Sequence, residues 1–243
     1  MNNDLTILPV VPEENEESVK RELHPNLPNV FKGQLVTLVG GVRMGKGTLW
    51  NNFLHNPNFY EDLFSSVQVI SPTVWNDSTS RFTAKKYKET CYDTYTDEII
   101  EGLIKSQIEK KAIDGADTSY ALIVDDSYGE FNRHGRKGGA ILRLASRFRH
   151  YVRKGDACLY LYSTQKYLDC IPLLRANSTS FIVSGMIKNK KELEAIKYDL
   201  DDSYGGGVDE LMERGRGEPY QWVYFRLDSC PPEAYLNFSE QIY

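Results

Sequence analysis

Several features that would point to other classes of protein are scarce or missing in this sequence. Its four cysteines show no Cys-x-x-Cys spacing and its four histidines form no metal-spaced group, so we expect neither a disulfide framework nor a zinc site. No apolar run approaches the length of a membrane span, and the polar, acidic N-terminal region is unlike a signal peptide. These absences favour a reducing intracellular setting, with no membrane insertion by the chain itself.

The chain also lacks an overall excess of basic residues. Its formal net charge is −5, so any binding to nucleic acid has to depend on a local patch. With 243 residues, 41% of them hydrophobic and 26% charged, the composition is typical of one globular domain with a substantial core. We expect an extended N-terminal arm over residues 1–30, interrupted by prolines, and a single domain over residues 31–243.

The most informative segment that is present is a glycine-rich loop after the apolar run Leu35–Val39. Its glycines and lysine have the spacing of a phosphate-binding loop between a buried strand and a helix that begins near Lys46. Such glycines let backbone N–H groups turn toward phosphate oxygens, and the lysine is expected to reach the β- and γ-phosphates. The residues expected to hold the nucleotide are Gly40, Gly41, Val42, Arg43, Met44, Gly45, Lys46, Gly47 and Thr48.

One position of this loop departs from the usual pattern. A Ser or Thr commonly follows the lysine and its hydroxyl holds Mg²⁺, whereas this chain has Gly47 there and its first hydroxyl is on Thr48. The same Gly-Lys-Gly-Thr ending is found in nucleoside monophosphate kinases. We expect Thr48 to serve the metal directly or through a water molecule, and the sequence leaves both open.

Two adjacent aspartates follow a second apolar run. Residues 121–124 have the composition of a central parallel strand, and ligands of such sheets bind at the carboxyl ends of the strands. We therefore expect Asp125 to lie in the Mg²⁺ shell and Asp126 to polarise the attacking water as a general base. Capping of a helix is the alternative for such a pair, but the phosphate-binding loop argues against it.

Strands and helices alternate along the chain. Strand patterns occupy residues 34–39, 67–70, 121–124, 158–162, 181–184 and 221–225. Helical patterns occupy residues 97–111, 140–153 and 190–198. We place the last strand at an edge of the sheet and predict residues 76–96 to be irregular. The alternation predicts an α/β fold, a three-layer P-loop NTPase of the ASCE type with a mainly parallel central sheet.

Gln165 lies just past the expected strand at residues 158–162. A polar side chain at that place can contact both the γ-phosphate and the attacking water, and so report which nucleotide is bound. A loop glutamine that faces solvent is the alternative.

A basic stretch over residues 131–154 contrasts with the acidic chain, because it has eight Lys or Arg residues and no acid. A solvated helix face with an attached loop is the plain interpretation. Alternatively, its glycine-rich part tracks a nucleic-acid backbone, and Arg147 or Arg149 reaches the γ-phosphate of a neighbouring subunit as an arginine finger. The expected backbone contacts are Arg133, Arg136 and Lys137.

The order of these motifs resembles that of viral genome-packaging ATPases of the FtsK–HerA superfamily, the group typified by the poxvirus packaging ATPase. The motifs after the phosphate-binding loop are Ile70–Thr73, Asp125–Asp126, Arg149–His150, Ser163–Gln165, Ile171–Pro172 and Arg175–Asn177. The resemblance spans roughly residues 34–197, and its most specific part is the Gln165 element with the later Pro172, Arg175 and Asn177.

The resemblance implies an ATP-driven motor that threads double-stranded DNA into a preformed capsid through a ring, usually hexameric in this superfamily. It implies ATP and Mg²⁺ as cofactors. The partners it implies are double-stranded DNA, further copies of this chain and a viral capsid or vertex protein. The expected locations are the host cytoplasm, a viral factory or the virion.

The resemblance also assigns roles to single residues. Lys46 and Thr48 are expected to bind phosphates and Mg²⁺, and Asp125 to hold the metal. Asp126 is expected to activate water, and Gln165 to sense the γ-phosphate. The candidates for a finger acting in trans are, in order of preference, Arg149, Arg147 and Arg175.

Other functions remain compatible with parts of the sequence. A nucleoside monophosphate kinase would share the loop ending and would use the basic stretch as a lid, but it leaves the aspartate pair and Gln165 without roles. A nucleotide-dependent assembly factor would bind ATP without turnover. A cellular HerA-like translocase is the third alternative, and the sequence has no appended barrel to favour it.

Overall fold

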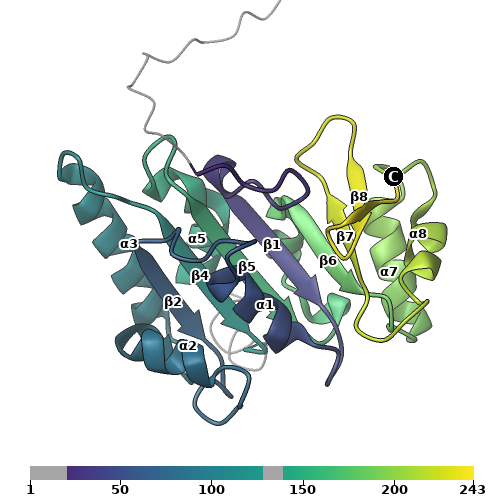
Figure 1. The fold of residues 1–243 in the computed structure, drawn as a ribbon, viewed down its shortest axis with the longest axis horizontal. Helices are drawn as coiled ribbons and strands as arrows, with labels where there is room; N and C mark the ends of the chain where they lie inside the picture. The colour runs from purple at the N-terminus through teal and green to yellow at the C-terminus, as the bar shows by residue number, and fades with distance from the viewer. Residues whose placement is uncertain (1–20, 128–138) are drawn as a thin grey trace, which may run out of the picture.

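In the computed structural model, a nine-stranded sheet organises the described part of the chain, residues 21–127 and 139–243 (Figure 1). The strands are β1 (Gln34–Val39), β2 (Ser66–Ile70), β3 (Cys91–Tyr92), β4 (Tyr120–Asp125), β5 (Cys158–Thr164), β6 (Ser180–Ser184), β7 (Trp222–Arg226), β8 (Glu233–Leu236) and β9 (Glu240–Gln241). Their order across the sheet is β3-β2-β4-β5-β1-β6-β7-β8-β9. Every neighbouring pair from β3 to β6 is parallel, and the pairs from β6 to β9 are antiparallel. The predicted mainly parallel sheet is confirmed.

Helices cover both faces of this sheet. The α-helices are α1 (Lys46–His55), α2 (Arg81–Lys86), α3 (Asp97–Ala112), α5 (Ala140–Arg147), α6 (Pro172–Asn177), α7 (Lys190–Leu200) and α8 (Val208–Arg214). Short 3₁₀ turns are η1 (Val30–Lys32), η2 (Lys88–Thr90), η4 (Phe148–Tyr151) and η5 (Tyr167–Asp169). Helices α1 and α2 pack on one face, and α3, α5, α6, α7 and α8 pack on the other. The result is the predicted three-layer arrangement.

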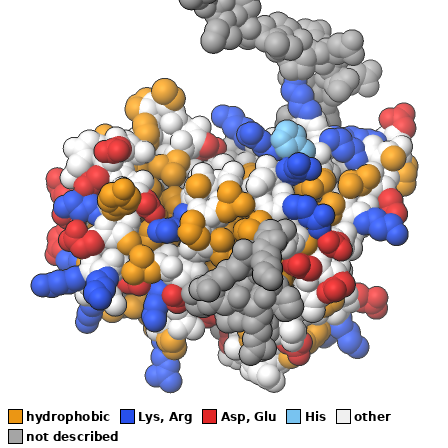
Figure 2. Space-filling model, turned by 180° about the vertical axis from the view of Figure 1, so that it is seen from behind, with side chains coloured by type: hydrophobic (Ala, Val, Ile, Leu, Met, Phe, Trp, Pro, Cys, Tyr) orange, Lys and Arg blue, Asp and Glu red, His pale blue; other side chains and the backbone are white. Residues whose placement is uncertain are grey.

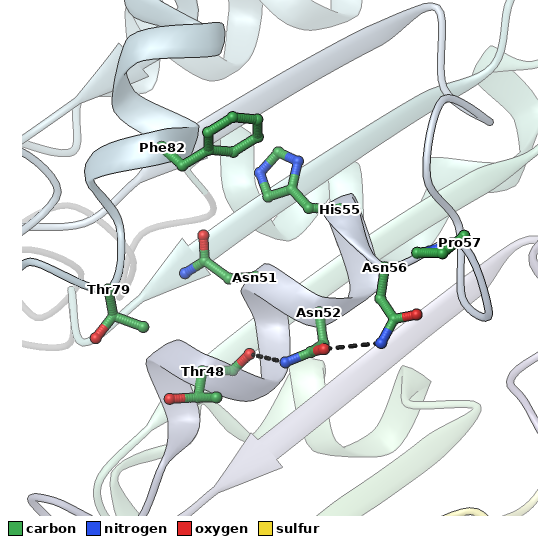
Figure 3. Close-up of a pocket in the computed structure, with 8 residues that line it drawn as sticks. All are labelled: Thr48, Asn51, Asn52, His55, Asn56, Pro57, Thr79 and Phe82. Atoms are coloured by element: carbon green, nitrogen blue, oxygen red, sulfur yellow. Dashed lines mark hydrogen bonds between the residues drawn. The ribbon is translucent and has the colours of Figure 1, made fainter.

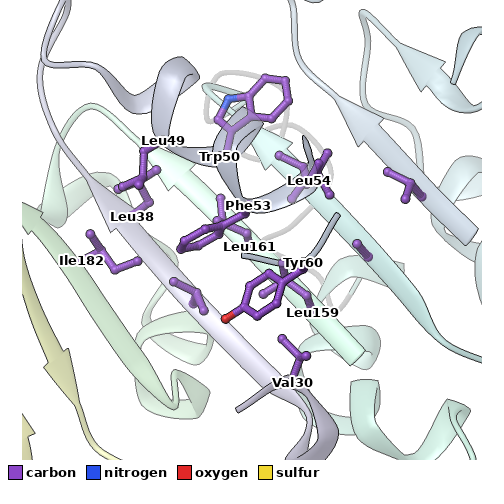
Figure 4. Close-up of a cluster of buried hydrophobic side chains, with 14 of the residues drawn as sticks. Val30, Leu38, Leu49, Trp50, Phe53, Leu54, Tyr60, Leu159, Leu161 and Ile182 are labelled. Carbon is purple, nitrogen blue, oxygen red and sulfur yellow. The ribbon is translucent and has the colours of Figure 1, made fainter. Parts of the chain in front are cut away.

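The two faces follow from alternation along the central strands. In β1, Val36 and Leu38 point to the α1 side, whereas Leu35 and Val39 point to the opposite side. Because both faces are covered, the central strands carry apolar residues at nearly every position. Figure 4 shows the α1 face, where Phe53 of α1 packs over the sheet.

The segment before β1 packs on this core. Leu27 and Val30 are buried, and the hydroxyl of Tyr60 donates a hydrogen bond of 2.7 Å to the carbonyl of Pro28. The Arg226 guanidinium also donates to the carbonyl of Pro25, at 3.1 Å. The described end of the expected arm therefore contacts its own chain. No helix within residues 21–127 and 139–243 is long and apolar enough to cross a membrane.

Three details of the fold differ from the sequence prediction: the end of one helix, the content of residues 76–96 and the place of the last predicted strand in the sheet. The helix predicted over residues 140–153 ends at Arg147, and the 3₁₀ turn η4 follows it. The carbonyl of Phe148 cannot continue the helix because it accepts hydrogen bonds from the Tyr120 hydroxyl (3.1 Å) and the Cys158 thiol (3.7 Å) instead. Residues 76–96 were predicted irregular, yet they contain α2, η2 and β3. The strand predicted at an edge, β7, lies between β6 and β8, so that placement was wrong.

Candidate nucleotide-binding site

The carboxyl ends of three parallel strands bring the predicted site residues to one edge of the sheet. Val39, which ends β1, is level with Thr164 of β5, and Asp125 of β4 is level with Ser163 of β5. The glycine-rich loop, the aspartate pair and Gln165 each begin at these strand ends. Parallel register alone therefore gathers residues that are more than a hundred positions apart in the sequence.

The loop between β1 and α1 has the backbone of a phosphate cradle. Gly45, directly before α1, has φ +85°, and Arg43 has φ +62°, so the chain turns through left-handed conformations before the helix begins. The loop is anchored by the N–H of Gly40, which donates to the carbonyl of Thr164 at 3.1 Å. The N-terminus of α1 then faces this edge, and the first N–H groups of a helix have no partner within the helix itself. The local geometry is that expected for binding phosphates.

One carboxylate oxygen of Asp126 contacts two other predicted site residues, Lys46 and Gln165. The Lys46 side chain is 7% exposed and its ammonium lies 3.3 Å from Oδ2 of Asp126, and the Gln165 amide donates to the same Oδ2 at 3.2 Å. Asp126 has φ +48°, and its N–H donates to the carbonyl of Ser163 at 3.1 Å. Its other oxygen is buried and accepts no hydrogen bond from the described residues. The lysine that would bind phosphates is thus paired with the candidate base.

Asp125 is buried beside this pair. Its Oδ2 accepts a hydrogen bond of 3.3 Å from the Ser71 hydroxyl, and its buried Oδ1 has no partner among the described residues. Burial raises the pKa of this carboxyl, and the neighbouring negative charge of Asp126 raises it further. A cation at Oδ1 would offset both effects.

These oxygens fit Mg²⁺. Within the described residues, no group of three or more His, Cys, Asp or Glu side chains could hold a metal ion. Mg²⁺ is commonly bound by one or two carboxylates together with nucleotide phosphates, so the buried Asp125 with its unpartnered Oδ1 suits it. Thr48, the candidate hydroxyl, lies in the first turn of α1.

Thr48 also lines an open pocket of about 490 Å³ between α1 and α2 (Figure 3). Its lining residues are Thr48, Asn51, Asn52, His55, Asn56, Pro57, Thr79 and Phe82. The Asn51 and Asn52 amides donate to the carbonyls of Gly47 and Thr48, at 2.8 and 2.9 Å. These bonds turn the amides back onto the helix and stiffen its first turn.

Aromatic residues close the opposite side of the loop, next to β7. A Cβ atom added to Gly40 would lie 3.0 Å from the Trp222 ring, and one added to Gly45 would lie 3.3 Å from the Tyr220 ring. Trp222 is buried, but Tyr220 is 64% exposed. The segment that carries them approaches closely because Gly215 lies against Gly185, where a Cβ would come within 1.7 Å of the Gly215 carbonyl oxygen. An exposed aromatic ring therefore borders the cradle.

The candidate arginine fingers are not at this edge. The backbone and Cβ of Arg149 lie against Gly33, directly before β1, and Arg147 lines a groove with Ile108 and Glu109 of α3. Both belong to the amino-terminal edge of the parallel strands. Arg175 forms an ion pair of 2.9 Å with Asp199. Their role in trans stays a prediction.

The predicted DNA-contacting residues Arg133, Arg136 and Lys137 lie outside the described residues. On the face shown in Figure 2, basic side chains of the described residues gather around a histidine in the upper right part of the view, and acidic ones lie mainly at the left and lower right.

Sequence reasoning missed two residues beside the loop, Tyr220 and Asp77. The carboxylate of Asp77 lies close to Gly47, where a Cβ would be 3.5 Å from Oδ2. Neither residue follows a parallel strand directly, and so the rule that points to strand ends does not find them. The sequence did contain one signal that could have led to Asp77: position 47, where Ser or Thr is usual, is a glycine and has no side chain.

Comparison with solved structures supports the assignment of the fold. The structure is similar to that of the genome packaging NTPase B204 from Sulfolobus turreted icosahedral virus 2 in complex with AMP, with 20% identity, a TM-score of 0.60, and coverage of 84% of this chain and 96% of that one. The chain has the fold of a P-loop NTPase.

Two further B204 structures agree with this P-loop NTPase fold. The complex with AMPPCP has 19% identity and a TM-score of 0.60, and covers 84% of this chain and 97% of that one. B204 from Sulfolobus turreted icosahedral virus, described as a DNA-packaging ATPase, has 18% identity and a TM-score of 0.59, with coverage of 84% and 96%. No protein-family model matches the sequence, and no curated protein sequence does so either.

Proposed function

We propose that this chain is an ATPase that drives double-stranded DNA into a viral capsid. The observation that carries the hydrolytic part is the Asp126 carboxylate, which is contacted at 3.3 Å by Lys46 and at 3.2 Å by Gln165 beside a phosphate cradle. The packaging part is supported by the likeness of the fold to B204, over 84% of this chain. At 20% identity this likeness concerns the fold, so the translocating activity is the proposal.

The residues divide the work of hydrolysis. The loop N–H groups and Lys46 bind the phosphates, and this draws the ammonium away from Asp126 toward the transferred group. Asp125 and Thr48 would hold Mg²⁺, which, when bound, would offset the negative charge of the phosphates and of the leaving group. Lys46 supplies the second positive charge from a nearly dry position, where its interactions are stronger than in bulk water.

Asp126 then acts as the base. Once Lys46 turns to phosphate, the Oδ2 atom keeps the Gln165 amide and can accept a proton from water, while Oδ1 has no partner in the described chain. Gln165 orients that water through its carbonyl oxygen as its N–H₂ group stays on Asp126. The hydrogen bond between Gln165 and Asp126 therefore links the base to the presence or absence of the γ-phosphate.

Different side chains lie at the two ends of this edge of the sheet, so we expect the nucleotide to bind there in one orientation. Asp126 and Gln165 lie on the β4–β5 side of the loop, so the γ-phosphate points there. The nucleoside then extends to the β6–β7 side, where the exposed Tyr220 ring borders Gly45. An aromatic ring at that place can stack on the base.

The experiment that tests the function is steady-state ATP hydrolysis with and without long double-stranded DNA, at two salt concentrations. We expect DNA to stimulate turnover, and more salt to reduce that stimulation because it competes for phosphate contacts. Lys46→Ala should remove turnover, since it deletes the cationic phosphate ligand. Turnover that needs a nucleoside monophosphate acceptor and ignores DNA would instead identify a kinase.

A further inference from the structure

The absence of a side chain at position 47 leaves room that a carboxylate from another segment fills. A Cβ atom placed on Gly47 would lie 3.5 Å from Oδ2 of Asp77 and 4.0 Å from the Thr79 methyl group. Asp77 belongs to the connection between β2 and α2, far from the loop in sequence. In the usual pattern this direction from the helix carries the hydroxyl that binds Mg²⁺.

The connection holds Asp77 in a defined orientation. Its N–H donates to the carbonyl of Thr73 at 2.9 Å, and its Oδ1 accepts from the N–H of Thr79 at 3.1 Å. Its carbonyl accepts from the N–H of Ser80 at 3.2 Å. Within the described residues, no hydrogen bond to Oδ2 occurs. One carboxylate oxygen therefore fixes the turn, and the other is presented to Gly47.

The same connection begins next to the buried acid of the site. Ser71, which follows β2, donates to Oδ2 of Asp125 at 3.3 Å, and Ser71 and Thr73 hydroxyls lie 3.4 Å apart. The segment that carries Asp77 thus runs from Asp125 to the first turn of α1. Several side-chain oxygens that could bind a cation therefore lie along this segment.

Charge decides what this carboxylate can do once a nucleotide is bound. In the free chain, a carboxylate near the N-terminus of α1 is favourable because of the helix dipole. Phosphates bring several negative charges to the same place, and a second anion there becomes unfavourable unless a cation separates them. A divalent cation reverses the sign of the interaction.

We propose that Asp77 supplies, through Oδ2, the Mg²⁺ ligand that Gly47 cannot provide, directly or through a bound water. The proposal rests on the proposed nucleotide-dependent function. With Asp125, it gives the metal two carboxylates from different segments, within the one or two that Mg²⁺ usually takes alongside phosphates.

The test measures metal binding rather than turnover. Mn²⁺ is titrated into the complex of the full chain with a non-hydrolysable ATP analogue, and free Mn²⁺ is measured by electron paramagnetic resonance. Asp77→Asn keeps the oxygen that accepts from Thr79 and removes the charge. We expect it to weaken Mn²⁺ binding at least tenfold while binding of the analogue without metal is unchanged or tighter. Asp114→Asn, an exposed acid after α3, is the matched control and should leave Mn²⁺ affinity unchanged.

A second variant makes the test specific. A side chain at position 47 meets only ordinary contacts, and the helical position suits any residue, so Gly47→Ser should fold. In the double variant Gly47→Ser with Asp77→Asn, the new hydroxyl should restore most of the Mn²⁺ affinity. Unchanged Mn²⁺ affinity in Asp77→Asn would overturn the inference while leaving the nucleotide site intact. A wild-type chain that binds no nucleotide at all would instead refute the proposed function, and this proposal with it.

Discussion

Substituting asparagine for Asp126 should separate nucleotide binding from hydrolysis, because this carboxylate both holds Lys46 and serves as the base. The change keeps the shape of the side chain and removes its charge. Lys46 lies 3.3 Å from Asp126, so phosphates have to compete with the carboxylate for the ammonium. Removing the competitor should tighten ATP binding, while removing the base should slow turnover.

The magnitude follows from the geometry of the pair. Unit charges 3.3 Å apart interact by about 5 kcal/mol at an effective dielectric constant of about 20. Most of this is offset because Lys46 is only 7% exposed and loses hydration, while the 28% exposure of Asp126 screens the remainder. A net competition of about 1–2 kcal/mol corresponds to ATP binding about 5–30 times tighter. Loss of a general base should lower turnover by about 10²–10⁴-fold.

Two measurements check these values together. Titration with a fluorescent ATP analogue gives the affinity, and phosphate release gives the turnover, each compared with wild type and with the exposed control Asp114→Asn. Turnover within threefold of wild type would refute the role of Asp126 as base. A tenfold loss of affinity would refute the competition for Lys46, since it would mean that the carboxylate helps to hold the nucleotide.

Two further predictions concern the sides of the site. Tyr220→Ala should weaken binding of ATP about tenfold and leave binding of inorganic triphosphate unchanged, as stacking on a base contributes about 1–2 kcal/mol; equal losses for both ligands would exclude a base platform. Burial lowers the pKa of His55 to about 4 from 6.5, so the folded chain resists protonation that the unfolded chain accepts. Stability should therefore fall as pH drops from about 6.5 to 4, and His55→Gln should reduce this loss in urea denaturation by about 1–2 kcal/mol, after allowance for its partial exposure. An identical pH dependence in both proteins would contradict that shift.

The part of the site that sequence predicted well depends on local signals and parallel register. The glycines with Lys46 define a strand, a turn and a helix start within a dozen residues, and Asp125 ends an apolar run. Since carboxyl ends of parallel strands share an edge, the approach of Asp126 to Lys46 followed from topology. Their ion pair did not follow, because it depends on the φ of +48° at Asp126.

The parts that were missed depend on contacts between distant segments. Asp77 reaches Gly47 from a connection whose polar residues carry no helical or strand period, and α2 is only six residues long. Tyr220 reaches the loop because an antiparallel β7 starts at the same edge where the parallel strands end. The internal position of β7 was nonetheless visible in principle: Trp222, Val223, Tyr224 and Phe225 form a continuous apolar run, which is typical of a strand buried on both faces.

The chain order itself fixes where the candidate fingers lie, and this limits how they can act. Helix α5 begins after the carboxyl end of β4, and β5 begins at the amino-terminal edge, so the last residue of α5, Arg147, and the turn η4 that contains Arg149 must lie toward that edge. The strands between the two edges are about six residues long, which is about 20 Å. Neither arginine can therefore reach the phosphates of its own chain. If one of them acts as a finger, the amino-terminal edge of one subunit has to face the carboxyl edge of the next, and such a head-to-tail contact closes a ring when the rotation between subunits divides a full turn.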